Sequence, residues 1–340
     1  MVKDRLAAPV TGERRTMKAI VFERYGTPAN ALDLRKVAVP AIEEHQVLLR
    51  VRASSVNPME WYTVTGLLLG RPQNGLRKPK RTALGADVAG VVEAVGSDVK
   101  ELQPGDEVFG TCGAAWAEYA PAREARLVPK PTNLSFEEAA AVPVAGLTAV
   151  QALRDQGRVQ AGEKVLVNGG SGGVGTFTVQ LAKWFGAEVT AVCHTRNVEL
   201  VQSLGADHVV DYVREDFTRG DERYDLMIDI AGSRSFLESR RVLKPDARVV
   251  VVGAPRAGRV LGPLAHTIGM RVLSMGRSQP VTFFISKITQ EDLLFLQGLL
   301  AEGDVTPVID RRYELSQLPD ALAYLGEGHA RAKVVVAVQE

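Results

Sequence analysis

The chain has 340 residues, of which 46% are hydrophobic, so it is long and apolar enough for two domains with buried cores. Its 41 basic and 40 acidic side chains leave a net charge of +1, which gives no electrostatic case for binding nucleic acid or an anionic membrane. Only two cysteines are present, which excludes a disulfide framework and a cysteine-rich metal site and fits a cytoplasmic location. No apolar run approaches the length of a membrane span.

The first third of the chain has the pattern of an irregular β-rich domain. Residues 1–16 mix acidic and basic side chains without an apolar core, so they are not a secretory signal and we expect a flexible tail. Residues 17–140 carry short β-like runs divided by turn sequences such as the PGD at 104–106, and we expect them to form the first part of one domain. The expected strands cover residues 17–22, 46–53, 90–95, 107–110 and 116–120.

The stretch KVLVNGGSGGVG, at residues 164–175, is the clearest motif in the chain. An apolar run enters glycines at G-x-G-x-x-G spacing, and a helix-like segment and a second strand-like segment at 188–193 follow. In such a unit the glycines permit a tight turn, close backbone approach to a pyrophosphate and close helix packing, while the helix N-terminus offers N–H groups to phosphate. We therefore predict a dinucleotide site whose loop residues are Gly170, Ser171, Gly172, Gly173, Val174 and Gly175.

The end of the second strand indicates which dinucleotide binds. An NAD enzyme usually places Asp or Glu there to hold the ribose 2′-OH, but this chain has no acid before Glu199. Arg196 can pair with a 2′-phosphate, and Thr195 and Asn197 can donate hydrogen bonds to it. We therefore favour NADPH over NADH, with a solvated Arg196 as the alternative interpretation.

Strand-like and helix-like segments alternate through the rest of the middle region. Further parallel strands are expected at residues 209–212, 225–230, 248–252 and 271–274. They predict a Rossmann-type, doubly wound, six-stranded parallel sheet within residues 141–277. Beyond it, helices at 291–301 and 318–325 and a strand at 333–338 predict that residues 278–340 return to the first domain.

Several ordered motifs resemble one known family. They read MKAIV at 17–21, SVNP at 55–58, GADVAGVVEAVG at 85–96, PGDEVFG at 104–110, AGLTA at 145–149 and LGADHVVDY at 204–212. With the glycine loop, they resemble a zinc-independent member of the medium-chain dehydrogenase/reductase superfamily, of the quinone oxidoreductase (zeta-crystallin-like) type. The resemblance implies a GroES-like β-rich catalytic domain beside the Rossmann domain, and a homodimer paired through the edge of the latter.

The residues at the zinc positions of that superfamily are not zinc ligands. Zinc-dependent relatives carry a Cys in the loop after the strand at 46–53 and a Gly-His-Glu ahead of the AGVV run. This chain has Ser54, Ser55 and Val56 in that loop and reads GAD at 85–87, so we expect neither catalytic nor structural zinc. Without that Lewis acid, reduction of a quinone or activated C=C is easier than alcohol oxidation.

The resemblance also implies roles for individual residues. Asn57 and Thr148 resemble polar residues that border the nicotinamide and its ribose, and Tyr62 resembles a pocket tyrosine that contacts or protonates substrate, with a packing role as the alternative. Further cofactor contacts are implied for Tyr212 at the 2′-phosphate, for Val252 and Gly253 at the carboxamide, and for the basic tail residues Arg331 and Lys333, which solvated surface charge would equally explain.

These observations predict an NADPH-dependent, zinc-free oxidoreductase that transfers a hydride to a small-molecule quinone or α,β-unsaturated carbonyl. One alternative is an enoyl-thioester reductase that holds a phosphate-bearing carrier on the basic loop at 71–81. Another is a sensor protein that binds NADPH and catalyses little.

Overall fold

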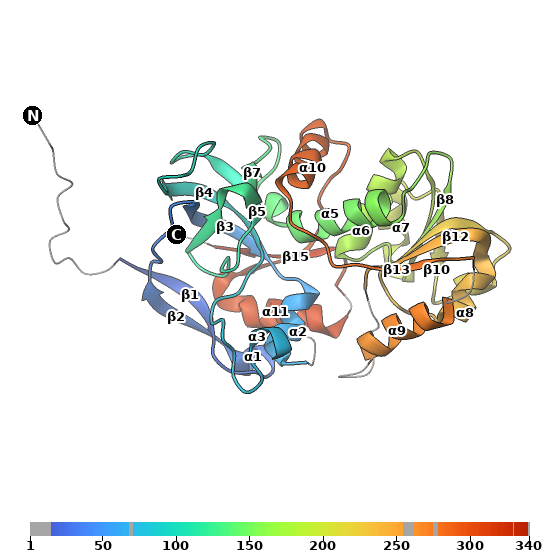
Figure 1. Cartoon of the computed structure of the whole chain (residues 1–340), viewed down its shortest axis with the longest axis horizontal. Coiled ribbons are helices and arrows are strands. Elements are labelled where there is room, and N and C mark those ends of the chain that lie inside the picture. Colours follow the sequence, from blue (N-terminus) through green and yellow to red (C-terminus); the bar gives the residue numbers. More distant parts are fainter. Residues whose placement is uncertain (1–14, 68–70, 254–261, 275–277, 329, 339–340) are drawn as a thin grey trace, which may run out of the picture.

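The computed structural model describes residues 15–67, 71–253, 262–274, 278–328 and 330–338. Two lobes lie side by side in Figure 1, a β-rich domain built from both ends of the chain and a doubly wound domain built from its middle. The helices α5 (Pro143–Val150) and α6 (Gly173–Trp184) lie between the two sheets, with α5 closer to the β-rich domain. The predicted Rossmann and GroES-like architecture is confirmed.

The doubly wound domain, called the dinucleotide domain below, has six parallel strands in the order β10-β9-β8-β11-β12-β13. These are β8 (Lys164–Asn168), β9 (Glu188–Cys193), β10 (His208–Asp211), β11 (Tyr224–Asp229), β12 (Leu243–Val251) and β13 (Val281–Phe283). In chain order this is 3-2-1-4-5-6, so the first strand, with the glycine loop after it, lies where the strand order reverses. Val165, Leu166 and Val167 are fully buried, because helices cover both faces of the sheet.

The predicted sixth strand at 271–274 is wrong. These residues end the helix α9 (Gly262–Ser274), and the sixth strand is β13, which pairs with β12. The predicted domain boundary at 277 therefore separates this strand from its sheet. Four residues with two apolar side chains carry no usable periodicity, so a short strand and a helix end cannot be told apart there. The remaining helices of this domain are a π-helix at Gln151–Gln156, α7 (Val198–Ser203) and α8 (Phe236–Ser239).

The β-rich domain contains a seven-stranded sheet, in which β14-β15-β3-β4-β5-β7 form a path and β6 also pairs with β3, and a two-stranded sheet of β1 and β2. The strands are β1 (Thr16–Phe22), β2 (Leu32–Ala38), β3 (Gln46–Ser55), β4 (Asp87–Val95), β5 (Glu107–Thr111), β6 (Tyr119–Arg123), β7 (Leu127–Pro129), β14 (Ile309–Glu314) and β15 (Lys333–Ala337). The strand expected at 116–120 lies three residues later. Sequence reading missed β2, β7 and β14. At least half of the residues in β2 and β14 are exposed, and β7 has only three residues, so the apolar pattern of each is weak.

The helices of this domain come from both ends of the chain. They are α1 (Pro28–Ala31), α2 (Pro58–Thr65), α3 (Arg71–Asn74), α4 (Phe136–Ala140), α10 (Gln290–Glu302) and α11 (Leu318–Glu327). Contact between α2 and α11 is close, because a Cβ on Gly326 would lie 2.1 Å from Nε1 of Trp61. In the part of the chain that the structure describes, no helix has the length and hydropathy needed to cross a membrane.

The two domains meet at the glycine loop. Gly172 forms a parallel bridge with Ala332, and the Ala332 N–H donates to the Ser171 carbonyl at 2.8 Å. Ala332 immediately precedes β15, which pairs with β3 in the middle of the β-rich sheet. The carboxyl edge of the dinucleotide sheet is thus held against the β-rich domain, where ligands of doubly wound folds bind.

Candidate active site

The glycines of the loop have different structural roles. A Cβ on Gly175 would lie 2.1 Å from the Gly169 carbonyl oxygen, and one on Gly170 would lie 2.9 Å from Cβ of Ala191, so both permit close packing. A Cβ on Gly172 would meet nothing nearer than 3.6 Å. Gly172 is also the N-cap of α6 and supplies no side-chain cap, so first-turn N–H groups remain for a phosphate.

The end of β9 contains an unsatisfied acceptor. Asn197 is 4% exposed, its Nδ2 donates to Ser171 Oγ at 2.9 Å, and its Oδ1 is buried with no hydrogen-bond partner among the described residues. A buried acceptor without a hydrogen bond costs about 1–3 kcal/mol of stability. A hydrogen bond from a ligand hydroxyl would remove this cost. The N–H groups at the start of α6 and the unpaired Asn197 acceptor therefore fit a nucleotide.

Thr195 and Asn197, which were predicted to donate hydrogen bonds to a 2′-phosphate, both make hydrogen bonds within the protein. The Thr195 hydroxyl donates to Asp211 Oδ2 at 2.7 Å, which lowers the pKa of Asp211. One of the two N–H groups of the Asn197 amide donates to Ser171 Oγ. The Thr195 hydroxyl is therefore engaged within the protein, whereas the second Asn197 N–H and the Arg196 guanidinium remain predicted phosphate contacts.

A cavity of about 550 Å³ lies beside this cation. Its lining residues are Thr195, Arg196, Val198, Glu199, Val209, Asp211, Arg214 and Glu215. Sequence reading missed Arg214, whose Nε is 3.4 Å from Asp211 Oδ2. Tyr212, which was predicted to contact the 2′-phosphate, follows β10 and lies edge-to-face with His194, with 5.6 Å between ring centroids.

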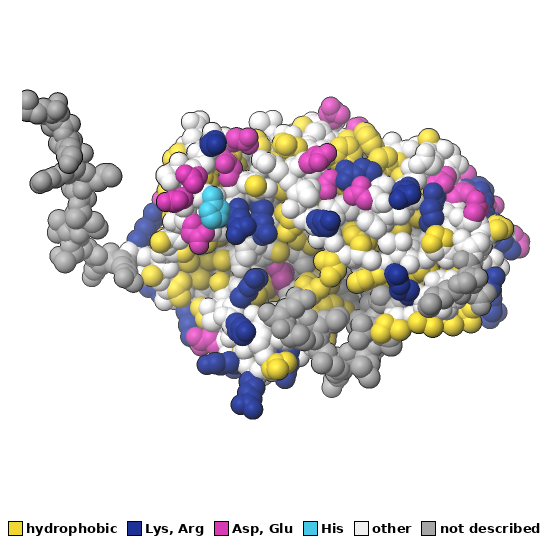
Figure 2. Space-filling view, viewed as in Figure 1, with side chains coloured by type: hydrophobic (Ala, Val, Ile, Leu, Met, Phe, Trp, Pro, Cys, Tyr) yellow, Lys and Arg dark blue, Asp and Glu magenta, His cyan; other side chains and the backbone are white. Residues whose placement is uncertain are grey.

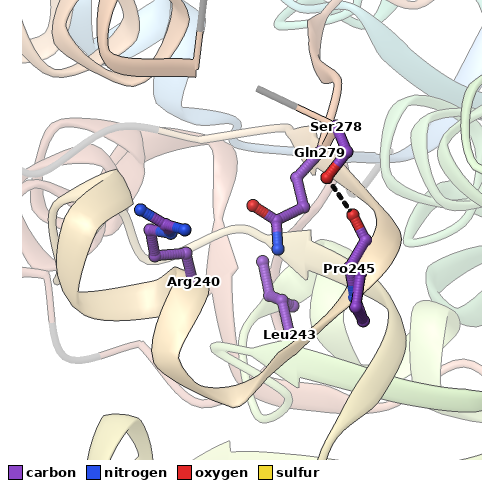
Figure 3. Close-up of a pocket in the computed structure, with 5 residues that line it drawn as sticks. All are labelled: Arg240, Leu243, Pro245, Ser278 and Gln279. Atoms are coloured by element: carbon purple, nitrogen blue, oxygen red, sulfur yellow. Dashed lines mark hydrogen bonds between the residues drawn. The ribbon is translucent and has the colours of Figure 1, made fainter. Parts of the chain in front are cut away.

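Another cavity, of about 400 Å³, lies away from this edge (Figure 3). Arg240, Leu243, Pro245, Ser278 and Gln279 line it, and the Ser278 hydroxyl donates to the Pro245 carbonyl. Leu243 begins β12, so this cavity is at the amino edge of the parallel sheet, opposite the glycine loop. None of the predicted site residues lines it, and we do not assign it to the site.

Polar residues of both domains lie on the other side of the loop. Asn57 is the N-cap of α2 and is buried. Thr148, on α5, donates to the Val144 carbonyl at 2.6 Å and lies 3.0 Å from Ser286 Oγ, a neighbour that sequence reading missed. Tyr62 is half-buried and lies edge-to-face with Trp61, 5.3 Å between ring centroids, so its packing contact is present and its proton-donor role stays a prediction.

The predicted cofactor contacts after β12 and in the C-terminal tail have different surroundings in the structure. Both Val252 and Gly253 donate their N–H groups to the Asp229 carbonyl, which places them at the carboxyl edge beside β11. The Arg331 side chain is exposed. Lys333 is not a solvated surface charge, since it is buried and its Nζ is 2.7 Å from Asn57 Oδ1 and 3.0 Å from Asp87 Oδ2. Its ammonium group is therefore paired within the protein, and its cofactor contact stays a prediction.

Two buried acids complete this side, and sequence reading assigned neither a role. Glu60 accepts the N–H of Asn57 at 2.8 Å and of Ala86 at 2.7 Å, and burial together with the charge of Asp87 raises the pKa of Glu60 to about 8. The Asn-x-x-Glu spacing at 57–60 is a capping-box signal that could have placed Glu60. For Asp87, a lone acid inside the apolar run at 85–92 was the available signal.

The cysteines offer no reactive thiolate. Burial raises the pKa of Cys112 to about 12 and that of Cys193 to about 11, so both stay protonated at neutral pH. Among the residues that the structure describes, no group of three or more His, Cys, Asp or Glu side chains is arranged to hold a metal ion.

The comparisons with known proteins agree with this geometry. Residues 43–132 match the alcohol dehydrogenase GroES-like domain, and residues 204–336 match the zinc-binding dehydrogenase family. The chloroplast envelope quinone oxidoreductase homolog of Arabidopsis thaliana is 36% identical over 95% of this chain and 98% of its own length. The chain belongs to the zinc-independent quinone oxidoreductase family.

Two further members of this quinone oxidoreductase family illustrate its range. The NADPH-dependent alkenal/one oxidoreductase of Arabidopsis thaliana is 35% identical over 95% of this chain and 80% of its own length. The solved structure of the quinone oxidoreductase from Coxiella burnetii superposes with a TM-score of 0.83 at 31% identity, covering 96% of this chain and all of that one.

The raised pKa of Glu60 predicts a pH-dependent stability. Between pH 4.5 and about 8 the unfolded chain has lost this proton while the folded chain keeps it, so stability falls as pH rises through that window. The Glu60→Gln variant cannot titrate there. Its free energy of unfolding relative to the native sequence should therefore rise with pH, by at most ~1.4 kcal/mol per pH unit.

Urea unfolding at several pH values between 5 and 8 measures this difference. The prediction concerns how this difference in unfolding free energy changes with pH, since the substitution also changes the absolute stability. Glu302→Gln, at an exposed position on α10, is the control and should follow the native curve. Parallel curves for Glu60→Gln and the native protein would contradict the prediction.

Proposed function

We propose that this protein uses NADPH to reduce quinones or α,β-unsaturated carbonyl compounds. The observation that carries the proposal is the meeting of a phosphate-binding loop with buried polar residues of the β-rich domain, through the contact of Ala332 with Ser171. This arrangement offers a nucleotide site on one side and a polar, partly enclosed surface on the other. The names of the quinone and alkenal/one oxidoreductase relatives support the same chemistry.

The residues of the chain act mainly by positioning and by exclusion of water. When bound, NADPH supplies the hydride for the electrophilic carbon of the substrate. Asn57 and Thr148 hold the polar boundary where the two domains meet, with Thr148 fixed by Val144 and Ser286. The proton that completes the two-electron reduction would be supplied by the Tyr62 hydroxyl or by water.

The NADPH preference rests on charge at the end of β9. Arg196 and Arg214 line the cavity there, and the carboxylate of Asp211 is engaged by Thr195 and Arg214. Glu199 and Glu215 line the same cavity and offset its positive charge. A phosphate would therefore be held by close contact with Arg196 and not by the net charge of the cavity.

A homodimer and a cytoplasmic location are also part of the proposal. The strand β13 is the last of the described strands on its side of the dinucleotide sheet, and its Phe283 and the following Ile285 are 45% and 71% exposed. The adjacent α9 exposes Ile268 and Val272. Figure 2 shows hydrophobic side chains gathered along the lower right margin of the molecule, where Figure 1 shows α9. Pairing of two copies along this edge would cover them. Two buried free thiols fit a reducing compartment.

The activity test is NADPH oxidation with a panel of quinones, enones and a crotonyl thioester. We expect turnover with quinones or enones, and Tyr62→Phe should lower kcat at least roughly tenfold while the ring keeps its contact with Trp61. Turnover of the thioester alone would favour the enoyl-thioester alternative. NADPH binding without any turnover would indicate a sensor and defeat the proposal. An unchanged kcat in Tyr62→Phe would assign the proton to water.

The cofactor preference is tested at Arg196. Replacing a charged hydrogen-bond partner of the 2′-phosphate costs about 1.5–3 kcal/mol, so Arg196→Gln should weaken NADPH binding roughly 10- to 100-fold and leave NADH nearly unaffected. Fluorescence titration with both cofactors measures this. Arg219→Gln, an exposed arginine of the same domain, is the control. An equal loss for NADPH and NADH would remove Arg196 from the phosphate site.

The dimer is tested by mass in solution. Light scattering coupled to gel filtration should give twice the chain mass for the native protein and a monomer for Ile285→Lys, because a lysine would bury a charge in the paired edge. Leu294→Lys, at an exposed position on α10, should remain dimeric. A native monomer would refute the dimer, and a dimeric Ile285→Lys would move its interface elsewhere.

A further inference from the structure

A buried ion pair lies between the two halves of the site. Lys333 Nζ is 3.0 Å from Asp87 Oδ2, and the side chains are 3% and 0% exposed. Withdrawing two charges from water is costly unless their other donors and acceptors are also satisfied. Asp87 meets this condition with both of its oxygens, and Lys333 donates to two acceptors, so the pair connects segments that are far apart in the chain.

Asp87 uses both of its carboxylate oxygens. Oδ1 accepts the Val144 N–H at 2.8 Å, where α5 begins. Oδ2 accepts Nδ2 of Asn57 at 2.9 Å and the hydroxyl of Ser55, in addition to Lys333. One carboxylate at the start of β4 thus holds the end of β3, the N-cap of α2, the first turn of α5 and the start of β15.

The same contacts fix the orientation of the Asn57 amide. Its nitrogen donates to Asp87 and its oxygen accepts from Lys333 at 2.7 Å, so exchange of the two amide ends would break both bonds. Asn57 also begins α2, the helix that carries Tyr62. On the other side, Val144 lies one helical turn before Thr148, whose hydroxyl donates to the Val144 carbonyl.

Lys333 connects this group to the phosphate-binding loop. The preceding residue, Ala332, donates its N–H to Ser171, and a Cβ on Gly173 would lie 3.2 Å from Cδ of Lys333. The aliphatic part of the lysine therefore lies against the loop while its ammonium group reaches Asp87. The loop contact and the ion pair are therefore made by consecutive residues.

We propose that Asp87, with Lys333 as its counter-ion, is a positioning residue that keeps Asn57 and Thr148 in register with the glycine loop, so that a bound nicotinamide is held in one orientation. This inference rests on the proposed function. Asp87 acts through the residues it holds and is not assigned a contact with substrate or cofactor.

A structural role alone makes a different prediction from a positioning role. If the pair only stabilised the fold, a variant that recovers stability would recover activity. Buried pairs can be replaced by neutral residues with little loss of stability, whereas removal of one partner leaves a buried charge unpaired. Stability should therefore depend on whether a buried charge is left unpaired. The orientation of the nicotinamide should depend on the complete set of hydrogen bonds.

The test compares Asp87→Asn, Lys333→Met and the double variant with the native full-length protein. The double variant should unfold at a higher urea concentration than either single variant, because no unpaired charge remains. Its kcat at saturating NADPH should stay at least tenfold below the native value, because Asn57 has lost the lysine donor. NADPH Kd should stay within about threefold, since the loop contacts are backbone bonds.

A readout that needs no turnover keeps the inference separate from the proposed function. The fluorescence lifetime of bound NADPH reports how firmly the nicotinamide is held, and we expect it to shorten in Asp87→Asn and in the double variant. The control is Asp225→Asn. Asp225 also binds a lysine, Lys244 at 2.7 Å, and a backbone N–H, that of Lys164 at 2.9 Å, but at the opposite edge of the sheet. The lifetime of NADPH bound to the Asp225→Asn variant, and the kcat of this variant, should not change.

Three results would overturn the inference. Recovery of both stability and native kcat in the double variant would make the pair structural only. An NADPH Kd that rises as much as kcat falls would make it a cofactor-binding element. If the native protein turns over no quinone or enone, the proposed function fails, and an unchanged nicotinamide lifetime in Asp87→Asn then rejects the positioning role separately.

Discussion

The three residues from Arg331 to Lys333 are the point on which the arrangement of the molecule depends. Ala332 is bonded to the glycine loop of one domain, and Lys333 begins the strand that completes the sheet of the other. Ala332 has a positive φ of 68°, an uncommon conformation for a residue with a side chain. That backbone turn lets one short segment contact the phosphate-binding loop and then enter the β-rich sheet.

The buried charges at this junction are paired. Asp87 and Lys333 neutralise each other beside Asn57, while the raised pKa of Glu60, about 8, favours the protonated form of that acid at neutral pH. A site of this kind has fixed dipoles and little mobile charge. Such preorganised polar surroundings suit a reaction in which charge moves between two bound molecules.

Sequence reading placed most of the fold correctly because its signals were local. The glycine spacing, the apolar strand runs and the turn residues predicted the doubly wound sheet and the short strands β1, β3, β4 and β5. It failed where local signals are weak, at the exposed strand β14 and at the short strand β13. The helix end at 271–274 has the same composition as a short strand, and only pairing with β12 shows which segment belongs to the sheet.

The site was predicted less completely than the fold. The loop glycines were predicted from their spacing and Asn57 and Thr148 from the family resemblance, and the structure brings these residues to one junction. The partners of Lys333, Thr195 and Asn197 could not be foreseen, because Asp87 and Asn57 are 246 and 276 residues from Lys333 in sequence. Whether a lysine faces a phosphate or a carboxylate depends on which distant strand arrives beside it, and no local pattern records that.

The β-rich domain takes its central sheet from both ends of the chain. Strand β15 lies between β14 and β3, so the sheet joins residues 46–55 directly to residues 333–337. The dinucleotide domain, in contrast, is formed from one continuous stretch ending at β13. During synthesis on the ribosome, that middle stretch is complete while the first domain still waits for its central strand. The order in which the domains can finish folding is therefore the reverse of the order in which they begin.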